Sequence, residues 1–223
     1  MNPPSKDQPA IKQLLDVMAA LRSPEGCPWD REQDHMSLRF HAVEEVYELI
    51  DAIEAGDEKE MIEELGDLLL QVVFHCQLAK ERKAYDFDQV AQGIVDKLVH
   101  RHPHVFGDSD AKTVDAVWTQ WEQLKKAEKQ GTEHERKSSL DGIPRHLPAL
   151  QYAEKLIKKA RKNSLIQAPE KSPSEPDPSS IGRQLFELTR QAQAHGLSAE
   201  ALLREETRQR ETHLRSQEEQ ASS

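Results

Sequence analysis

Residues 57–83, DEKEMIEELGDLLLQVVFHCQLAKERK, predict one long helix around which the fold is organised. It begins after Gly56-Asp57, a pair that ends the preceding helix. Between Leu68 and Phe74 the stretch is apolar almost all round, and a helix of that kind is normally covered by its neighbours. We therefore expect this helix to lie at the centre of its domain.

Three further helices are expected around residues 10–22, 37–55 and 88–102, because apolar residues recur there at spacings of three and four. On 37–55 the apolar stripe comprises Val43, Val46, Ile50 and Ile53. On 88–102 it comprises Val90, Ile94, Leu98 and Val99, which we expect to point inward. Four amphipathic helices with short connections predict an all-α, four-helix-bundle-like domain.

The composition agrees with a helical, cytoplasmic protein. Aromatic residues make up 5% and charged residues 31% of the 223, a mixture that favours helices over a β-sandwich. The net charge of −10 argues against nucleic acid as a partner. No apolar run predicts a membrane span or a signal peptide, and two distant cysteines, Cys27 and Cys76, are typical of a reducing compartment.

Acidic residues are concentrated between Glu44 and Asp67, where eleven acids accompany a single base. On one helix Glu44, Glu45 and Glu48 share a sector of roughly 100°. On the next, Glu64 and Asp67 are three residues apart and also share a sector. If Gly56 makes these helices antiparallel, the two sets face each other and favour a hard divalent cation, Mg²⁺ with Mn²⁺ as a substitute. The alternative is a solvated acidic face.

Four motifs, the first of them made of two segments, resemble the MazG family of all-α nucleoside triphosphate pyrophosphohydrolases. Glu44-Glu45-Val46-Tyr47-Glu48 and Glu64-Leu65-Gly66-Asp67 match the family pattern EExxE…ExxD. The segments 26–30 (GCPWD), 97–107 (KLVHRHPHVFG) and 139–150 (SLDGIPRHLPAL) are similar to the family in the same order. The resemblance covers about residues 10–165.

The resemblance implies hydrolysis of a nucleoside triphosphate to the monophosphate and pyrophosphate, in the service of nucleotide-pool housecleaning. It implies that Glu45, Glu48, Glu64 and Asp67 hold Mg²⁺, with Glu44 as a further ligand or as an acid that orients the attacking water. It also implies a homodimer or a higher oligomer. Two alternatives stay open: a more selective relative of dUTPase-like or phosphoribosyl-ATP-cleaving type, and a non-catalytic nucleotide-binding regulator.

Three residues outside the acidic pattern are candidates for substrate binding. Lys97 and Arg101 are four residues apart on one helix, so together they could clamp a triphosphate. The alternative is that they are there only because the C-terminal end of the helix dipole favours cations. Trp29 lies in a loop and either stacks on a base or fills the end of the bundle. The histidines at 100, 102 and 104 do not predict a zinc site, because Pro103 breaks the helix between them.

The second half of the chain departs from the family pattern. We expect a catalytic domain at 10–106, a helical connector at 107–166 and a Pro/Ser linker at 167–180. Residues 181–223 resemble a degenerate, truncated second repeat, in which Ser180 and Arg183 replace the two acids of ExxD. A repeat without those acids cannot hold Mg²⁺.

Overall fold

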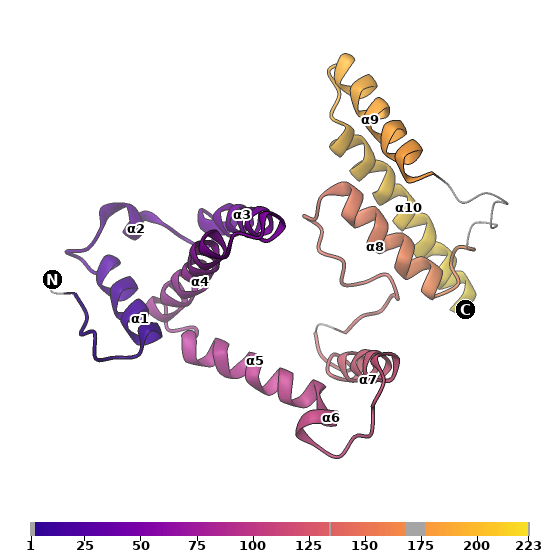
Figure 1. Ribbon diagram of the computed structural model, residues 1–223. Helices are drawn as coiled ribbons and strands as arrows, with labels where there is room; N and C mark the ends of the chain where they lie inside the picture. Colours follow the sequence, from indigo (N-terminus) through magenta and orange to yellow (C-terminus); the bar gives the residue numbers. More distant parts are fainter. Residues whose placement is uncertain (1–2, 134, 168–176, 223) are drawn as a thin grey trace. The chain divides into compact units, whose positions relative to one another are not determined.

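The computed structural model describes residues 3–133, 135–167 and 177–222, and within these ranges every regular element is a helix (Figure 1). The all-α prediction is confirmed. None of the helices in the described ranges combines the length and the apolar character needed to cross a membrane. Most of the expected linker, residues 168–176, lies outside the described residues.

The chain forms two compact units, and the first comprises residues 1–121. An antiparallel hairpin of α3 (His41–Ala55) and α4 (Glu58–Glu81) forms the body of this first unit (Figure 1). Gly56 ends α3 with φ = +67°, a left-handed conformation that glycine adopts without strain. Asp57 then starts α4, where its carboxylate accepts hydrogen bonds from the backbone N–H groups of Lys59 and Glu60 at 3.0 and 3.2 Å. The turn predicted at Gly56-Asp57 therefore folds the two helices against each other.

The core of this unit lies at the C-terminal half of α4. Met18 of α1 (Ala10–Leu21) and Leu38 of η1 (Leu38–Phe40) pack against Val73, Phe74 and Leu78, and all five are buried. A short helix, α2 (Pro28–Glu32), connects α1 to η1. The burial predicted for this helix is thus confirmed on one face of its C-terminal half, whereas Leu69 and Val72, within the apolar stretch, are each 39% exposed.

A bidentate ion pair lies at the same end of the hairpin. The guanidinium of Arg22, just after α1, donates from Nε and Nη2 to the two carboxylate oxygens of Glu81, each at 2.7 Å. The Arg22 side chain is only 8% exposed, and its hydrogen bonds lower the pKa of Glu81. Such paired bonds fix geometry as well as charge.

The helix α5 (Phe87–Arg101) contradicts one expectation. Asp86 forms a capping box with Gln89, and Phe87 packs against the core, so the first turn is anchored. Beyond that turn, the side chains of the apolar stripe, Val90, Ile94, Leu98 and Val99, are 40 to 48% exposed. The inward orientation that we predicted for them is therefore wrong. The helix leaves α4 at its C-terminal end, and no other helix of its own unit covers the stripe (Figure 1).

Two shorter helices follow, α6 (Pro103–Phe106) within the first unit and α7 (Val114–Ala127) across the boundary between the two units at residues 121 and 122. Pro103 begins α6, so the helix break predicted at this proline is present. In α7, Trp118 and Trp121 meet edge to face with ring centroids 5.5 Å apart. The two tryptophans therefore pack on each other.

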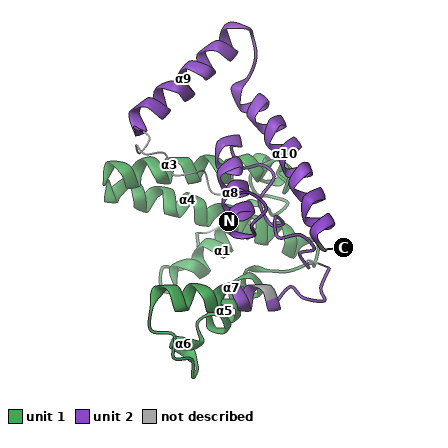
Figure 2. Cartoon of the chain, turned by 90° about the vertical axis from the view of Figure 1, so that its right-hand side faces the viewer, with its two compact units in different colours: residues 1–121 green, residues 122–223 purple. Residues whose placement is uncertain are grey.

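The second unit comprises residues 122–223, and the first comprises residues 1–121 (Figure 2). It contains α8 (Ala149–Lys162), α9 (Pro178–Ala194) and α10 (Ala199–Ser222). A buried cluster joins the 139–150 segment to α8 and α10: Leu140, Ile143, Leu156, Ala160 and Leu214.

The expected boundaries within the second half of the chain stay a prediction. In the structure, α8 from the expected connector at 107–166 and α10 from the expected repeat at 181–223 share one core. α9 already begins at Pro178, inside the predicted linker, with Asp177 as its cap. Gly196, at φ = +70°, lies in the turn that separates α9 from α10. That these helices form a degenerate repeat stays a prediction.

Replacing Met18 with Ala is expected to lower the free energy of unfolding by about 2–5 kcal/mol, because it leaves a cavity between α1, η1 and α4. Val17→Ala is the matched control, since Val17 is on the same helix but 36% exposed; its effect should stay within about 0.5 kcal/mol. Urea unfolding measures both. Equal losses in the two variants would contradict the placement of the core.

Candidate metal centre

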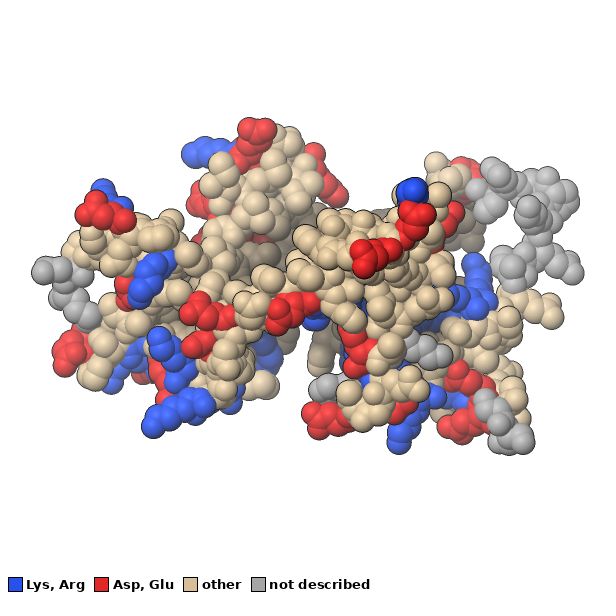
Figure 3. All heavy atoms as spheres, turned by 90° about the horizontal axis from the view of Figure 1, so that it is seen from below, with Lys and Arg blue, Asp and Glu red and all other residues tan. Residues whose placement is uncertain are grey.

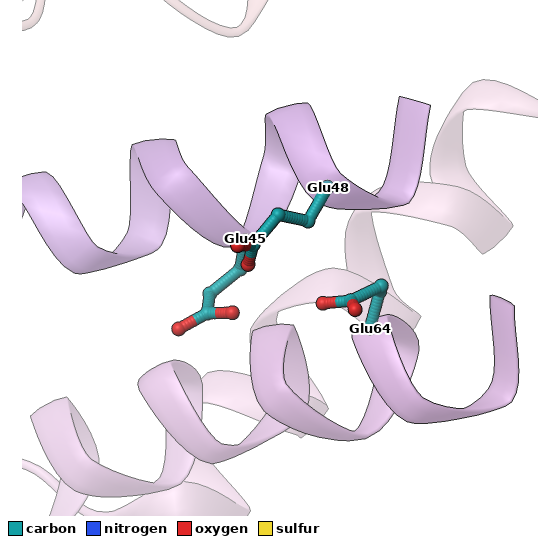
Figure 4. A group of neighbouring side chains, drawn as sticks. All are labelled: Glu45, Glu48 and Glu64. Atoms are coloured by element: carbon teal, nitrogen blue, oxygen red, sulfur yellow. The ribbon is translucent and has the colours of Figure 1, made fainter. Parts of the chain in front are cut away.

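Three carboxylates converge between α3 and α4. Glu45 and Glu48 project from α3 and Glu64 projects from α4, and one carboxylate oxygen of each lies within 4.8 Å of the other two (Figure 4). The three-residue spacing of Glu45 and Glu48 puts both on one face of α3, and the antiparallel turn at Gly56 brings α4 against that face. It is the only such group of potential metal ligands in the described part of the chain.

This crowding changes the acidity of two carboxyl groups. Burial raises the pKa of Glu45, and the negative charges of Asp67 and Glu48 raise it further. Burial likewise raises the pKa of Glu64, with the charges of Glu48 and Asp67 adding to the effect. Asp67, three residues after Glu64 on α4, therefore belongs to the same electrostatic cluster. The contributions of the neighbouring acids to both shifts mean that the ionised carboxylates repel one another in the folded protein.

The crowding is local. On the face shown in Figure 3, acidic and basic side chains are interspersed and separated by wide areas that carry neither. A general acidic surface keeps its carboxylates apart in solvent, whereas here carboxylate oxygens from two helices lie within 4.8 Å of one another. The set consists of hard oxygen donors, which fit Mg²⁺ or Mn²⁺ better than softer metals.

Glu44 is not part of this group. Its side chain is 66% exposed, and its carboxylate lies 3.7 Å from Nδ1 of His41. The ring of His41 in turn meets the edge of Trp29, at a centroid distance of 6.3 Å and an interplanar angle of 68°. Trp29 is 54% exposed, so it does not fill the end of a bundle. The roles expected for Glu44 and Trp29 stay predictions.

The cationic pair is also apart from the acids in a single chain. Lys97 and Arg101 lie on α5, which starts at the C-terminal end of α4, whereas Glu64 and Asp67 lie on the N-terminal half of α4 (Figure 1). The guanidinium of Arg101 lies 5.3 Å from the ring centroid of Trp121. The phosphate clamp therefore stays a prediction.

Gln71 is a site neighbour that the sequence analysis missed. It lies on α4, is 8% exposed, and its amide Nε2 donates to Oε1 of Glu45 at 3.4 Å. A glutamine carries no motif of its own, but its spacing would have revealed it. It follows Asp67 by four residues and Glu64 by seven, and so shares their face of α4.

Residues 33–106 match the family model described as the MazG nucleotide pyrophosphohydrolase domain. This range contains α3, α4 and all the carboxylates of the cluster. A relative from Streptomyces cacaoi, described as an uncharacterized 26.1 kDa protein in the blaB 3'region, is 43% identical over 205 residues, which make up 91% of this chain and 81% of that protein.

Other relatives are longer. The nucleoside triphosphate pyrophosphohydrolase of Escherichia coli K12 is 48% identical over 151 residues, and the nucleoside triphosphate pyrophosphohydrolase/pyrophosphatase MazG of Thermotoga maritima is 44% identical over 150 residues. Each match covers 67% of this chain and 56% of the relative, so the chain spans about half the length of these two proteins.

Among solved structures, the crystal structure of a mazG-related protein from Thermotoga maritima aligns with a TM-score of 0.45 and 25% identity, over 52% of this chain and 98% of that one. The sequence similarity extends through the carboxylate-bearing helices and, in the Streptomyces relative, over most of both chains. The chain belongs to the MazG nucleotide pyrophosphohydrolase family.

Proposed function

We propose that this protein hydrolyses nucleoside triphosphates at the α–β bond, with Mg²⁺ held by Glu45, Glu48 and Glu64 and supported by Asp67. The observation that carries the proposal is the approach of three carboxylate oxygens from two helices to within 4.8 Å of one another. Folding forces these charges together against their own repulsion, and a divalent cation removes that repulsion. The names of the E. coli and Thermotoga relatives support the same activity.

The proposed reaction is the addition of water to the α-phosphorus. The α–β anhydride bond breaks, and the products are a nucleoside monophosphate and pyrophosphate. The cation, when bound, neutralises phosphate charge and lowers the pKa of a coordinated water. Glu44 is proposed to orient the attacking water, Lys97 and Arg101 to bind the triphosphate, and Trp29 to stack on the base. The physiological role that we propose is housecleaning of the cytoplasmic nucleotide pool.

We also propose that two copies of the chain pair through the apolar stripes that a single copy leaves exposed. On α3 the stripe comprises Val43, Val46, Ile50 and Ile53, exposed by 40 to 55%. On α4 it comprises Ile62, Leu65, Leu69 and Val72, exposed by 39 to 74%. The stripe on α5 was described above. Exposed apolar side chains in such number are unusual on a monomer, and a two-fold pair would bury them. Pairing would also offer a route for Lys97 and Arg101 of one copy to approach the acids of the other.

Product analysis tests the reaction. With a panel of nucleoside triphosphates and Mg²⁺, pyrophosphate should appear in step with the monophosphate. Glu48→Gln should lower the rate by at least about a hundredfold, since it removes a proposed metal ligand. Glu54→Gln, which removes an exposed acid from the same helix, should have little effect. Diphosphate and orthophosphate as first products would rule out α–β cleavage.

The raised pKa values give the metal-free protein a distinct pH dependence. As pH falls from 7.5 toward the ordinary carboxyl pKa of 4.5, the folded protein takes up protons on Glu45 and Glu64 before the unfolded chain does. Protonation of these two groups should therefore raise the free energy of unfolding on acidification. This gain should be lost as the pH rises through the raised pKa values of Glu45 and Glu64. Saturating Mg²⁺ should reverse the trend, because protons then compete with the ion.

Denaturant unfolding at several pH values measures this contribution as the difference between the wild type and a Glu45→Gln/Glu64→Gln variant. The subtraction removes the titration of the ten histidines, which both proteins share. A difference that does not vary with pH, with or without Mg²⁺, would mean that these carboxylates are ordinary solvated acids.

Pairing is tested by Ile94→Asp, which places a charge in the α5 stripe. Because Ile94 is 47% exposed in one chain, the variant should still fold but sediment as a monomer where the wild type sediments as a dimer. Val114→Asp, at a residue of α7 that is 74% exposed, is the control and should leave the dimer intact. A wild type that is monomeric at micromolar concentration would contradict the proposed interface.

A further inference from the structure

Gln71 combines two properties that a packing residue does not need. Its amide nitrogen reaches Oε1 of Glu45 at 3.4 Å, across the gap between α4 and α3. Its amide oxygen is buried and has no hydrogen-bond partner among the described residues. Its neighbours Val73 and Phe74 are buried and apolar, so the amide stands at the border between the core and the carboxylate cluster.

The chemistry of the two groups decides which way the amide points. An ionised carboxylate only accepts hydrogen bonds, so the amide must present its N–H to Glu45. The carbonyl oxygen is then turned away from the carboxylates, into surroundings that supply no protein donor. A buried acceptor without a donor costs folding free energy, whereas an apolar side chain of the same length would not. The Gln71 side chain thus makes a hydrogen bond to the carboxylate cluster, and in return it leaves an acceptor without a donor at the edge of the core.

We propose that Gln71 is a positioning residue for Glu45, an inference that rests on the proposed metal-dependent function. By holding one oxygen of the carboxylate, the amide fixes the rotation of the group. The second oxygen is thereby directed toward the place where Glu48 and Glu64 approach. Without this bond Glu45, repelled by its neighbours, would turn away from them. Outer partners of this kind set the affinity of a metal site without touching the ion.

A purely structural role predicts a different response to mutation. If Gln71 served the packing of α4, its replacement would lower stability and would affect ion binding only through that loss. If it positions Glu45, an apolar replacement of equal length should weaken ion binding while the metal-free protein is as stable as before or more stable. The two readings therefore differ in the sign of the stability change.

The experiment compares Gln71→Met with Gln77→Met in the full-length chain. Gln77 lies on the same helix and makes the same kind of bond, from Nε2 to Oε1 of Glu81 at 3.0 Å, but away from the acids. Mn²⁺ alone is titrated, with the free ion followed by electron paramagnetic resonance, and thermal unfolding is recorded in chelator. Gln71→Met should bind Mn²⁺ about tenfold more weakly, with an unfolding midpoint at or above that of the wild type. Gln77→Met should bind Mn²⁺ like the wild type.

Each other outcome overturns the inference. Unchanged Mn²⁺ affinity in Gln71→Met, or equal weakening in both variants, would show that the amide does not position Glu45. A lower midpoint in Gln71→Met would make Gln71 a packing residue. Glu48→Gln separates this failure from a failure of the proposed function. If the wild type binds no Mn²⁺, or Glu48→Gln binds it equally well, the metal centre itself is absent and both proposals fall.

Discussion

The repulsion among the carboxylates between α3 and α4 is the constraint on which the rest of the structure depends. Glu45, Glu48 and Glu64 are held within 4.8 Å of one another by a helical hairpin, and the charge of Asp67 acts on two of them. Left in water, these groups would separate. Their approach therefore has to be imposed by packing elsewhere, and it stores free energy that a divalent cation can release.

The packing that imposes it lies along the same helix. The C-terminal half of α4 is fixed by the buried cluster around Val73 and Phe74 and by the two-pronged bond from Arg22 to Glu81. The N-terminal half carries the acids and is held to α3 by the turn at Gly56. Packing of the C-terminal half of α4 thus offsets the cost of holding the acids together on its N-terminal half. Functional sites commonly depend on stability contributed elsewhere in the fold. In the dimer that we propose, a second copy would cover the apolar stripes left open on three helices and add further support.

Much of this arrangement could be predicted from the sequence, because it follows from local rules. The stop at Gly56, the cap at Asp57 and the three-residue spacings of the acids are short-range signals, and the hairpin shows each of them. Helical spacing could not separate Glu44 from Glu45. Neighbouring residues point about 100° apart, and only the position of α4 decides which of the two faces it.

The features that could not be predicted are those that depend on contacts far apart in the sequence. Periodicity identified the apolar stripe of α5 but not what covers it, and the stripe proved to be exposed. The joint core of Leu140, Leu156 and Leu214 unites segments that composition had divided. Helical spacing places Gln71 on the same face of α4 as the acids, but its bond to Glu45 joins residues 26 apart in the chain and could not be predicted.

The central claim is that one cation binds among the three carboxylates. The most direct measurement is the anomalous scattering of Mn²⁺ in crystals of the full-length protein. The account predicts an anomalous peak within about 2.0–2.6 Å of carboxylate oxygens of Glu45, Glu48 and Glu64. Well-ordered carboxylates at saturating Mn²⁺ with no peak between α3 and α4, or with peaks only on isolated surface acids, would contradict it.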